Sequence, residues 1–312
     1  MSPRVTVIVA TYNSSATLRC ALDSVRRQDF TDFEVWVVGD ACTDDSPDVV
    51  AGVGDERFQW FNRRENSGSQ SAPNMDGLAR ARGEYVAYLG HDDLWFPWHL
   101  STLVECIDAS GAALVHSLIA LVAADGPREL AGPAPSGVPY GLHFVPPSCW
   151  LHLASVMHEI GGWRPAPDLA RATDIDVLAR VVAAGHVVTG ARTLGVLKFP
   201  SQWWGTYARR GVPPQRAYLV RMIANPGELE RDVLRDIALV YSRDHFDFRA
   251  RTARAVARQI RATVRDVAAL AKRGLADAYG VDRWPMRAIL RWRFQRIRRR
   301  LRKPRGLADE QR

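Results

Sequence analysis

The chain has 312 residues, of which 47% are hydrophobic and 24% charged, proportions typical of a globular protein. These values exclude disordered and collagen-like classes, and four scattered cysteines without a Cys-x-x-Cys pair exclude a disulfide framework or a zinc knot. The net charge of +8 is uneven: residues 249–312 hold 20 Lys or Arg against 5 Asp or Glu, a sum of +15, which leaves −7 for residues 1–248. No stretch approaches the roughly 20 apolar residues of a spanning helix, and no signal peptide precedes the first strand pattern, so we expect a cytoplasmic protein.

Strand and helix patterns alternate through the first third of the chain. Short β-branched runs ending in polar turn residues predict strands, and apolar residues at spacings of three and four predict helices. Such alternation is typical of an α/β fold whose parallel sheet is covered on both faces. The expected strands lie within residues 5–13, 33–40, 57–62 and 85–90, and the expected helices lie near 15–25, 46–53, 70–82 and after Pro97.

The second part of the chain is less regular. A Pro- and Gly-rich stretch, residues 126–147, is expected to form a long crossover loop, followed by helices near 155–163 and 174–184. Beyond residue 207 the pattern becomes helical and basic. We therefore expect two regions, a domain of residues 1–210 and a helical, Arg-rich region of residues 211–312.

Acidic residues follow two of the expected strands. Asp40 ends the second strand, and Asp92 and Asp93 follow the fourth. Ligands of open α/β sheets bind beyond the carboxyl ends of the strands, and clustered carboxylates there often hold a divalent cation bound to phosphate. In the competing interpretation, Asp44 and Asp45 cap the helix at Ser46, and Asp93 caps the helix near Pro97.

These segments resemble family 2 glycosyltransferases of the GT-A fold. The similar segments are VIVATYN, VVGDACTDDS and ENSGSQSAPNMDGLARARGEYVAYLGHDDLW, followed later by GGWRPAPDLARATDIDVLARVVAAGH. The resemblance covers roughly residues 4–198. It implies a Rossmann-like, mostly parallel sheet flanked by helices, to which the chain adds a basic helical extension.

The resemblance also implies roles for individual residues. Thr11, Tyr12 and Asn13 would contact the nucleotide, and Asp40 would bond its base. Asp92 would bind a Mn²⁺ or Mg²⁺ ion that bridges the diphosphate. Asp174 would be the general base that deprotonates an acceptor hydroxyl, so that in-line attack inverts the anomeric carbon. Asn66, Gly68 and Asn74 complete the expected nucleotide-sugar site.

The chain departs from the family pattern at the metal motif. Gly90 stands where the first Asp of Asp-x-Asp is usual, and His91 fills the variable position. His91 could supply a nitrogen ligand, although strand alternation places it on the opposite side from Gly90 and Asp92. The main hypothesis is a metal-dependent inverting glycosyltransferase. The alternative is a non-catalytic protein that binds sugar nucleotides or glycans and has a degenerate metal motif.

The expected partners follow from the fold and the tail. The donor would be a nucleoside-diphosphate sugar, and the acceptor a glycan or a lipid-linked molecule. Arginines and apolar residues repeat at helical spacings within residues 251–267 and 286–301, so these amphipathic helices could lie on the inner face of an anionic membrane. No nucleic-acid-binding module matches, and we expect no nucleic acid partner.

Overall fold

The computed structural model describes residues 2–132, 145–204 and 212–246. Nine strands form one mixed sheet in the order β3-β2-β1-β4-β8-β6-β9-β5, with β7 paired to β6. The strands are β1 (Val5–Thr11), β2 (Phe33–Gly39), β3 (Phe58–Asn62), β4 (Tyr85–Tyr88), β5 (Leu94–Trp95), β6 (Leu114–Ala123), β7 (Gly126–Ala131), β8 (Trp150–Leu153) and β9 (Val188–Lys198).

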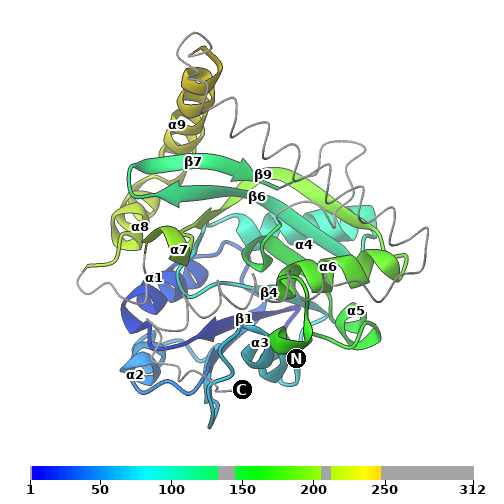
Figure 1. Cartoon of the computed structure of the whole chain (residues 1–312). Coiled ribbons are helices and arrows are strands. Elements are labelled where there is room, and N and C mark those ends of the chain that lie inside the picture. Colours follow the sequence, from blue (N-terminus) through cyan, green and yellow to red (C-terminus); the bar gives the residue numbers. More distant parts are fainter. Residues whose placement is uncertain (1, 133–144, 205–211, 247–312) are drawn as a thin grey trace.

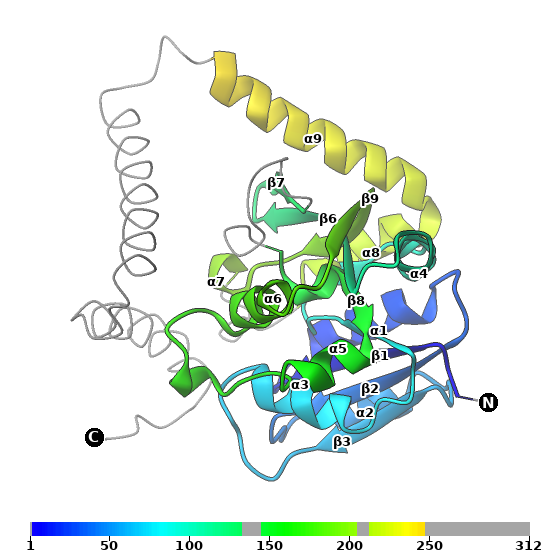
Figure 2. The same cartoon turned by 90° about the vertical axis from the view of Figure 1, so that its right-hand side faces the viewer.

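Helices cover both faces of this sheet, as Figure 2 shows. One face carries α1 (Ser15–Arg26) and α4 (His99–Ser110), and the other carries α3 (Ser71–Leu78), α5 (Ala154–Glu159) and α6 (Thr173–Ala183). The remaining helices are α2 (Ser46–Ala51), α7 (Ser201–Trp204), α8 (Gln215–Ala224) and α9 (Pro226–Phe246), with α9 running beside β7 (Figure 1).

The amino-terminal half confirms the predicted parallel arrangement. β2 and β4 both pair in parallel with β1, and β3 pairs in parallel with β2. The valines and the isoleucine of β1 point to both faces of the sheet. All of them are fully buried, because helices cover each face. The carboxyl ends of β1, β2 and β4 therefore meet at one edge, which carries Thr11, Asp40 and Asp92.

The strands after residue 90 are not among those that the sequence predicts. The long apolar run of β6 has no alternation, and such runs do not distinguish a buried strand from a buried helix. The expected crossover loop at 126–147 is wrong in its first part, because β7 pairs antiparallel with β6. Pro127 is compatible with this strand because β7 lies at an edge of the sheet.

The carboxyl-terminal helices pack onto the same sheet. Leu219 and Met222 of α8 and Val233 of α9 are buried in a cluster with Leu94 and Phe96. The expected domain boundary near residue 210 and the basic helices beyond residue 247 lie outside the described residues. Within the described residues, no helix combines the length and the apolarity that crossing a bilayer requires.

Candidate active site

Asp40, directly after β2, is hydrogen-bonded to the end of β1 and to the loop that follows β3. Its carboxylate is buried and accepts hydrogen bonds from Arg63 Nη1 at 2.7 Å, from the Ser67 backbone N at 3.0 Å and from the Gly68 N at 3.2 Å. Its own backbone N donates to the Thr11 carbonyl at 2.8 Å. Asp40 therefore already holds the 63–68 loop against β1, and any contact with a base would add to these bonds.

The loop after β1 is fixed by the loop after β2. Asn13 adopts a left-handed backbone with φ of 43°, and its Oδ1 accepts the Thr43 N at 2.8 Å. Asp44 Oδ2 accepts the Ser15 N at 3.0 Å and its Oδ1 accepts the Ser46 N at 3.2 Å. Asp44 therefore bonds the first residue of both α1 and α2, whereas Asp45, at the N-cap position of α2, makes no side-chain capping bond, so the capping interpretation holds for Asp44 alone.

Several buried polar atoms at this edge lack a hydrogen-bond partner within the described part of the chain. They are Thr11 Oγ1, Asn66 Nδ2 and Ser71 Oγ. Buried polar groups are nearly always bonded, so each such atom needs a ligand or water. Asn66 also accepts the Gly68 N at 2.6 Å, and Asn74 is buried in the first turn of α3. Thr11 and Asp40 thus follow β1 and β2 at one edge of the sheet, and Asn66 and Gly68 belong to the loop that Asp40 holds there.

The end of β4 places Asp92 and Asp93 in different roles. Asp93 is fully buried and accepts Ser148 Oγ at 2.6 Å, Lys198 Nζ at 2.8 Å and the Phe199 N at 3.1 Å. The expectation that it caps α4 is wrong, because these three donors use its carboxylate. Burial and the neighbouring Asp93 raise the pKa of Asp92.

Lys198 pairs with Asp93 and interacts electrostatically with Asp92 and Asp174. Burial by itself lowers the pKa of Lys198, but Asp93, Asp92 and Asp174 together raise it above its usual value. The ammonium therefore stays charged at neutral pH. The charges of two carboxylates in the loop after β4 and of one at the start of α6 thus act on one cation, which is paired with Asp93.

Asp174 lies at the first turn of α6. Its Oδ1 accepts the N–H of Ile175 at 2.9 Å. Burial raises the pKa of Asp174, while that hydrogen bond and the Lys198 charge oppose the increase. The neighbouring Thr173 accepts Gln70 Nε2 at 3.2 Å, which ties the start of α6 to the start of α3.

Gly90 and His91 determine how the residues fit a metal ion. A Cβ at Gly90 would lie 2.9 Å from Asp93 Oδ2 and 3.1 Å from Asp92 Oδ1, so an Asp here would crowd both carboxylates. His91 Nδ1 lies 3.2 Å from the Ala10 carbonyl, on the side of β1. Within the described residues no three His, Cys, Asp or Glu side chains form a metal-holding group. One carboxylate, from Asp92, still fits Mg²⁺ or Mn²⁺, since such ions are commonly held by one carboxylate and substrate phosphates.

Three site residues were missed by the sequence analysis. Ser148 donates to Asp93 and accepts the Gly90 N at 3.1 Å, and Gln215 Nε2 donates to the Asp92 carbonyl at 2.8 Å. The third is Lys198, one of only three lysines in the chain and placed at the end of an apolar run. That rarity is a signal that could have identified it, whereas no local pattern marks Ser148 or Gln215.

Comparisons with known proteins agree on the fold. Residues 6–128 match the family model described as glycosyl transferase family 2. The GalNAc(5)-diNAcBac-PP-undecaprenol beta-1,3-glucosyltransferase of Campylobacter jejuni is 34% identical over 105 residues, which are 33% of this chain and 34% of that protein. The chain spans about a third of the length of the curated relatives that it matches.

Two solved structures share the architecture. TarS 1-349 of S. aureus in complex with UDP-GlcNAc has a TM-score of 0.55 and 19% identity, over 80% of this chain and 73% of that one. The mannosyltransferase PcManGT of Pyrobaculum calidifontis, in complex with GDP-Man and Mn²⁺, has a TM-score of 0.53 and 18% identity, over 100% of this chain and 89% of that one. At these identities the likeness concerns the fold.

Proposed function

We propose that the chain is an inverting glycosyltransferase, because residues 6–128 match the model of glycosyl transferase family 2 and the fold resembles that of TarS. It transfers a sugar from a nucleoside-diphosphate sugar to a hydroxyl acceptor. The observation that carries the proposal is Lys198, which pairs with Asp93 at 2.8 Å and whose pKa the charges of Asp92 and Asp174 also raise. Asp92 and Asp93 follow β4, beyond the carboxyl ends of the parallel strands, where α/β sheets bind ligands.

The donor nucleotide occupies the edge formed by β1 and β2. Thr11, Tyr12 and Asn13 contact the nucleotide, with Asp40 beside the base. Thr11 Oγ1 and Asn66 Nδ2, which have no hydrogen-bond partner among the described residues, support this placement, because a nucleotide supplies both donors and acceptors. Gly68 and Asn74 complete the site. The complexes of TarS with UDP-GlcNAc and of PcManGT with GDP-Man show that related folds hold such donors.

Asp174 acts as the general base. A sugar hydroxyl is a weak nucleophile, and a positioned carboxylate contributes about 10² to 10⁴ in rate. Asp174 takes the acceptor proton while the hydroxyl attacks the anomeric carbon from the side opposite the diphosphate, which inverts the configuration. Its raised pKa, which burial causes, makes it a stronger base than an exposed aspartate.

Asp92 would hold Mn²⁺ or Mg²⁺ together with the donor phosphates, and His91 is the second candidate ligand. The bound ion would offset the negative charge that develops on the departing diphosphate. Lys198 keeps the Asp93 carboxylate compensated beside that position, through the ion pair at 2.8 Å. Asp93 therefore remains a support for the β4 end and leaves Asp92 to face the donor.

The acceptor is a glycan or a lipid-linked molecule. The printed name of the Campylobacter jejuni relative includes an undecaprenol-linked glycan, which supports the lipid-linked class. Trp203 on α7 is 44% exposed, five residues after Lys198, and an indole face suits a sugar ring. We further propose that the enzyme acts in the cytoplasm, with the basic segment of residues 249–312 on the membrane surface.

A non-catalytic sugar-nucleotide or glycan binding protein is the second candidate. Gly90 favours it, because the first carboxylate of the metal motif is absent and the Cβ contacts leave little room to restore it. Such a protein would bind UDP or GDP with an affinity that does not depend on Mn²⁺.

Calorimetry and donor turnover separate the two candidates. UDP and GDP are titrated with and without Mn²⁺, and turnover of UDP-glucose, UDP-GlcNAc and GDP-mannose is followed for the wild type and for Asp174→Asn. The transferase predicts binding that Mn²⁺ strengthens and turnover that Asp174→Asn lowers by about 10² to 10⁴. Equal background turnover of every donor by both proteins would remove the transferase proposal.

A further inference from the structure

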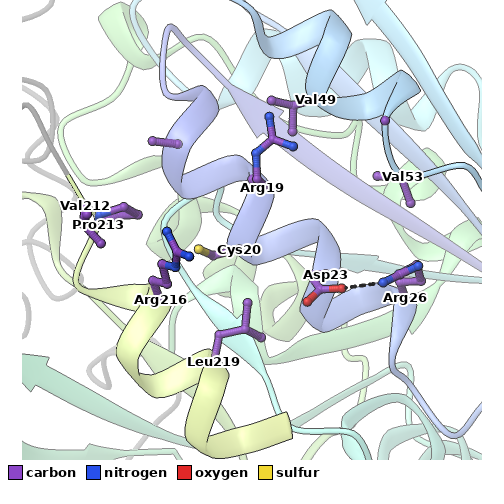
Figure 3. A pocket seen from close by; sticks show the side chains of 12 residues that line it. Arg19, Cys20, Asp23, Arg26, Val49, Val53, Val212, Pro213, Arg216 and Leu219 are labelled. Carbon is purple, nitrogen blue, oxygen red and sulfur yellow. Dashed lines mark hydrogen bonds and ion pairs between the residues drawn. The ribbon is translucent and has the colours of Figure 1, made fainter.

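A cavity of about 690 Å³ lies between α1, α2 and α8. Figure 3 shows the side chains that line it. Most of its lining is apolar and comes from the three helices and the segments that adjoin them. The apolar residues that line it include Ala16, Val49, Val53, Val212, Pro213 and Leu219.

Three arginines and one aspartate supply the charge of this cavity. Arg26 pairs with Asp23 at 3.0 Å, as the dashed line in Figure 3 shows. Arg19 and Arg216, from α1 and α8, have no carboxylate within ion-pair distance among the described residues. Arg19 and Arg216 both line the cavity beside Cys20. Burial raises the pKa of the Cys20 thiol to about 11, and the charges of Arg216 and Arg19 oppose that increase. The three arginines and one aspartate give the lining a net charge of +2, and the rest of the lining is mostly apolar.

An exposed apolar stripe continues from the cavity along α8. Val212 precedes the helix and is 74% exposed, and Val220 and Ile223 are 59% and 45% exposed. Arg216, Val220 and Ile223 follow one another at spacings of four and three, so they share one helix face. Cations among exposed apolar side chains on one helix face are typical of helices that lie in the surface of an anionic membrane.

We propose that the cavity binds the phosphate headgroup of an anionic membrane lipid, with Arg19 and Arg216 on the phosphate and the α8 stripe against the acyl chains. Guanidinium groups bond phosphate oxygens in pairs and with defined geometry. A soluble phosphate would contact the two arginines alone. A lipid would also contact the apolar residues that line the cavity and the exposed Val220 and Ile223. The surface and the chemistry together therefore favour the lipid.

The buried face of α8 connects this surface to the candidate active site. Gln215 is buried and donates to the Asp92 carbonyl at 2.8 Å, and Leu219 and Met222 are buried in the core. α8 is thus held to the loop that carries Asp92. A lipid on α8 would set the orientation of the active site toward the membrane.

Hydrogen exchange and vesicle flotation of the full chain test the proposal without any sugar donor, so the result is independent of the transferase reaction. Vesicles of phosphatidylglycerol and phosphatidylcholine are compared with pure phosphatidylcholine vesicles and with inorganic phosphate. Arg19→Gln/Arg216→Gln removes the two cavity cations. The matched control Arg128→Gln/Arg192→Gln removes two exposed cations from β7 and β9.

Anionic vesicles should slow exchange in peptides covering α1 and α8, and the cavity variant should lose this protection. Its vesicle affinity should fall about 30-fold relative to the control, which corresponds to about 1 kcal/mol for each cation near an anionic bilayer. Val220→Asp, at an exposed position, should also weaken vesicle binding. The proposal is overturned if inorganic phosphate alone gives the same protection, or if the cavity variant and the control bind vesicles equally.

Discussion

Replacement of Lys198 by Met tests the ion pair at the centre of the candidate site. The substitution preserves much of the side-chain volume and leaves Asp93, which is fully buried, without its cationic partner at 2.8 Å. Removing one member of a buried pair costs about 3–5 kcal/mol. We expect about 3 kcal/mol, because Ser148 Oγ and the Phe199 N still bond the carboxylate and Lys198 is 20% exposed. At about 2–4 °C for each kcal/mol, Tm should fall by about 6–12 °C.

Urea and thermal unfolding, followed by tryptophan fluorescence at pH 7, measure this loss. The pKa of Lys198 is raised, so its stabilising charge is fully present below about 10.5 and is lost only as the pH rises through the folded-state pKa. The deficit should therefore be constant between pH 6 and 9. Arg128→Met, which breaks the exposed pair with Asp125, is the control and should leave the free energy of unfolding nearly unchanged.

A double-mutant cycle decides whether the pair itself is responsible. Asp93→Asn combined with Lys198→Met should recover part of the loss, with a coupling energy of at least about 1.5 kcal/mol. The reasoning is refuted if Lys198→Met is as stable as Arg128→Met, or if the losses of unfolding free energy at positions 93 and 198 are additive. In either case the buried ion pair would stabilise the fold less than its geometry implies.

Three further outcomes are expected. Asp174→Asn should lower kcat by about 10² to 10⁴ with donor affinity unchanged in calorimetry, and the acid limb of the wild-type profile should lie above the usual pKa of about 3.9 because burial raises the pKa of Asp174. An unchanged kcat would exclude it as the base. Gly90→Asp should destabilise the fold by about 1–3 kcal/mol in urea unfolding and should not increase the Mn²⁺ response, because its Cβ would meet carboxylates at 2.9 and 3.1 Å; stronger Mn²⁺ activation in this variant would contradict the reasoning. Burial lowers the pKa of His99 to about 3 and of His152 to about 4, so stability should be complete above about pH 6.5 and should fall as the pH drops toward 4, by about 1.4 kcal/mol per pH unit for each histidine. His99→Leu should reduce that slope in urea titrations, and an unaltered slope would show that other groups control acid unfolding.

The first half of the fold and its strand-end residues could be predicted because their signals are local. β-branched runs broken by polar turns marked β1 to β4, and parallel pairing then required Asp40 and Asp92 to emerge at one edge. Strands such as β6 could not be recognised, since a continuous apolar run has no period that separates strand from helix. β7 was hidden for another reason, because its glycine and proline indicate a loop in any local window.

By itself the sequence determined which segments carry chemistry, namely the polar residues after β1, β2 and β4 and the acidic start of α6. Only the tertiary structure decided which partners those residues have. Lys198 reaches Asp93 across 105 residues, and Gln215 reaches the Asp92 carbonyl across 123. The free energy of a buried carboxylate depends on the cation or donor that packing brings within about 3 Å. A local pattern of apolar and polar residues does not reveal which distant residue that will be. This is why Asp93 suggested a helix cap in the sequence and forms a buried ion pair in the fold.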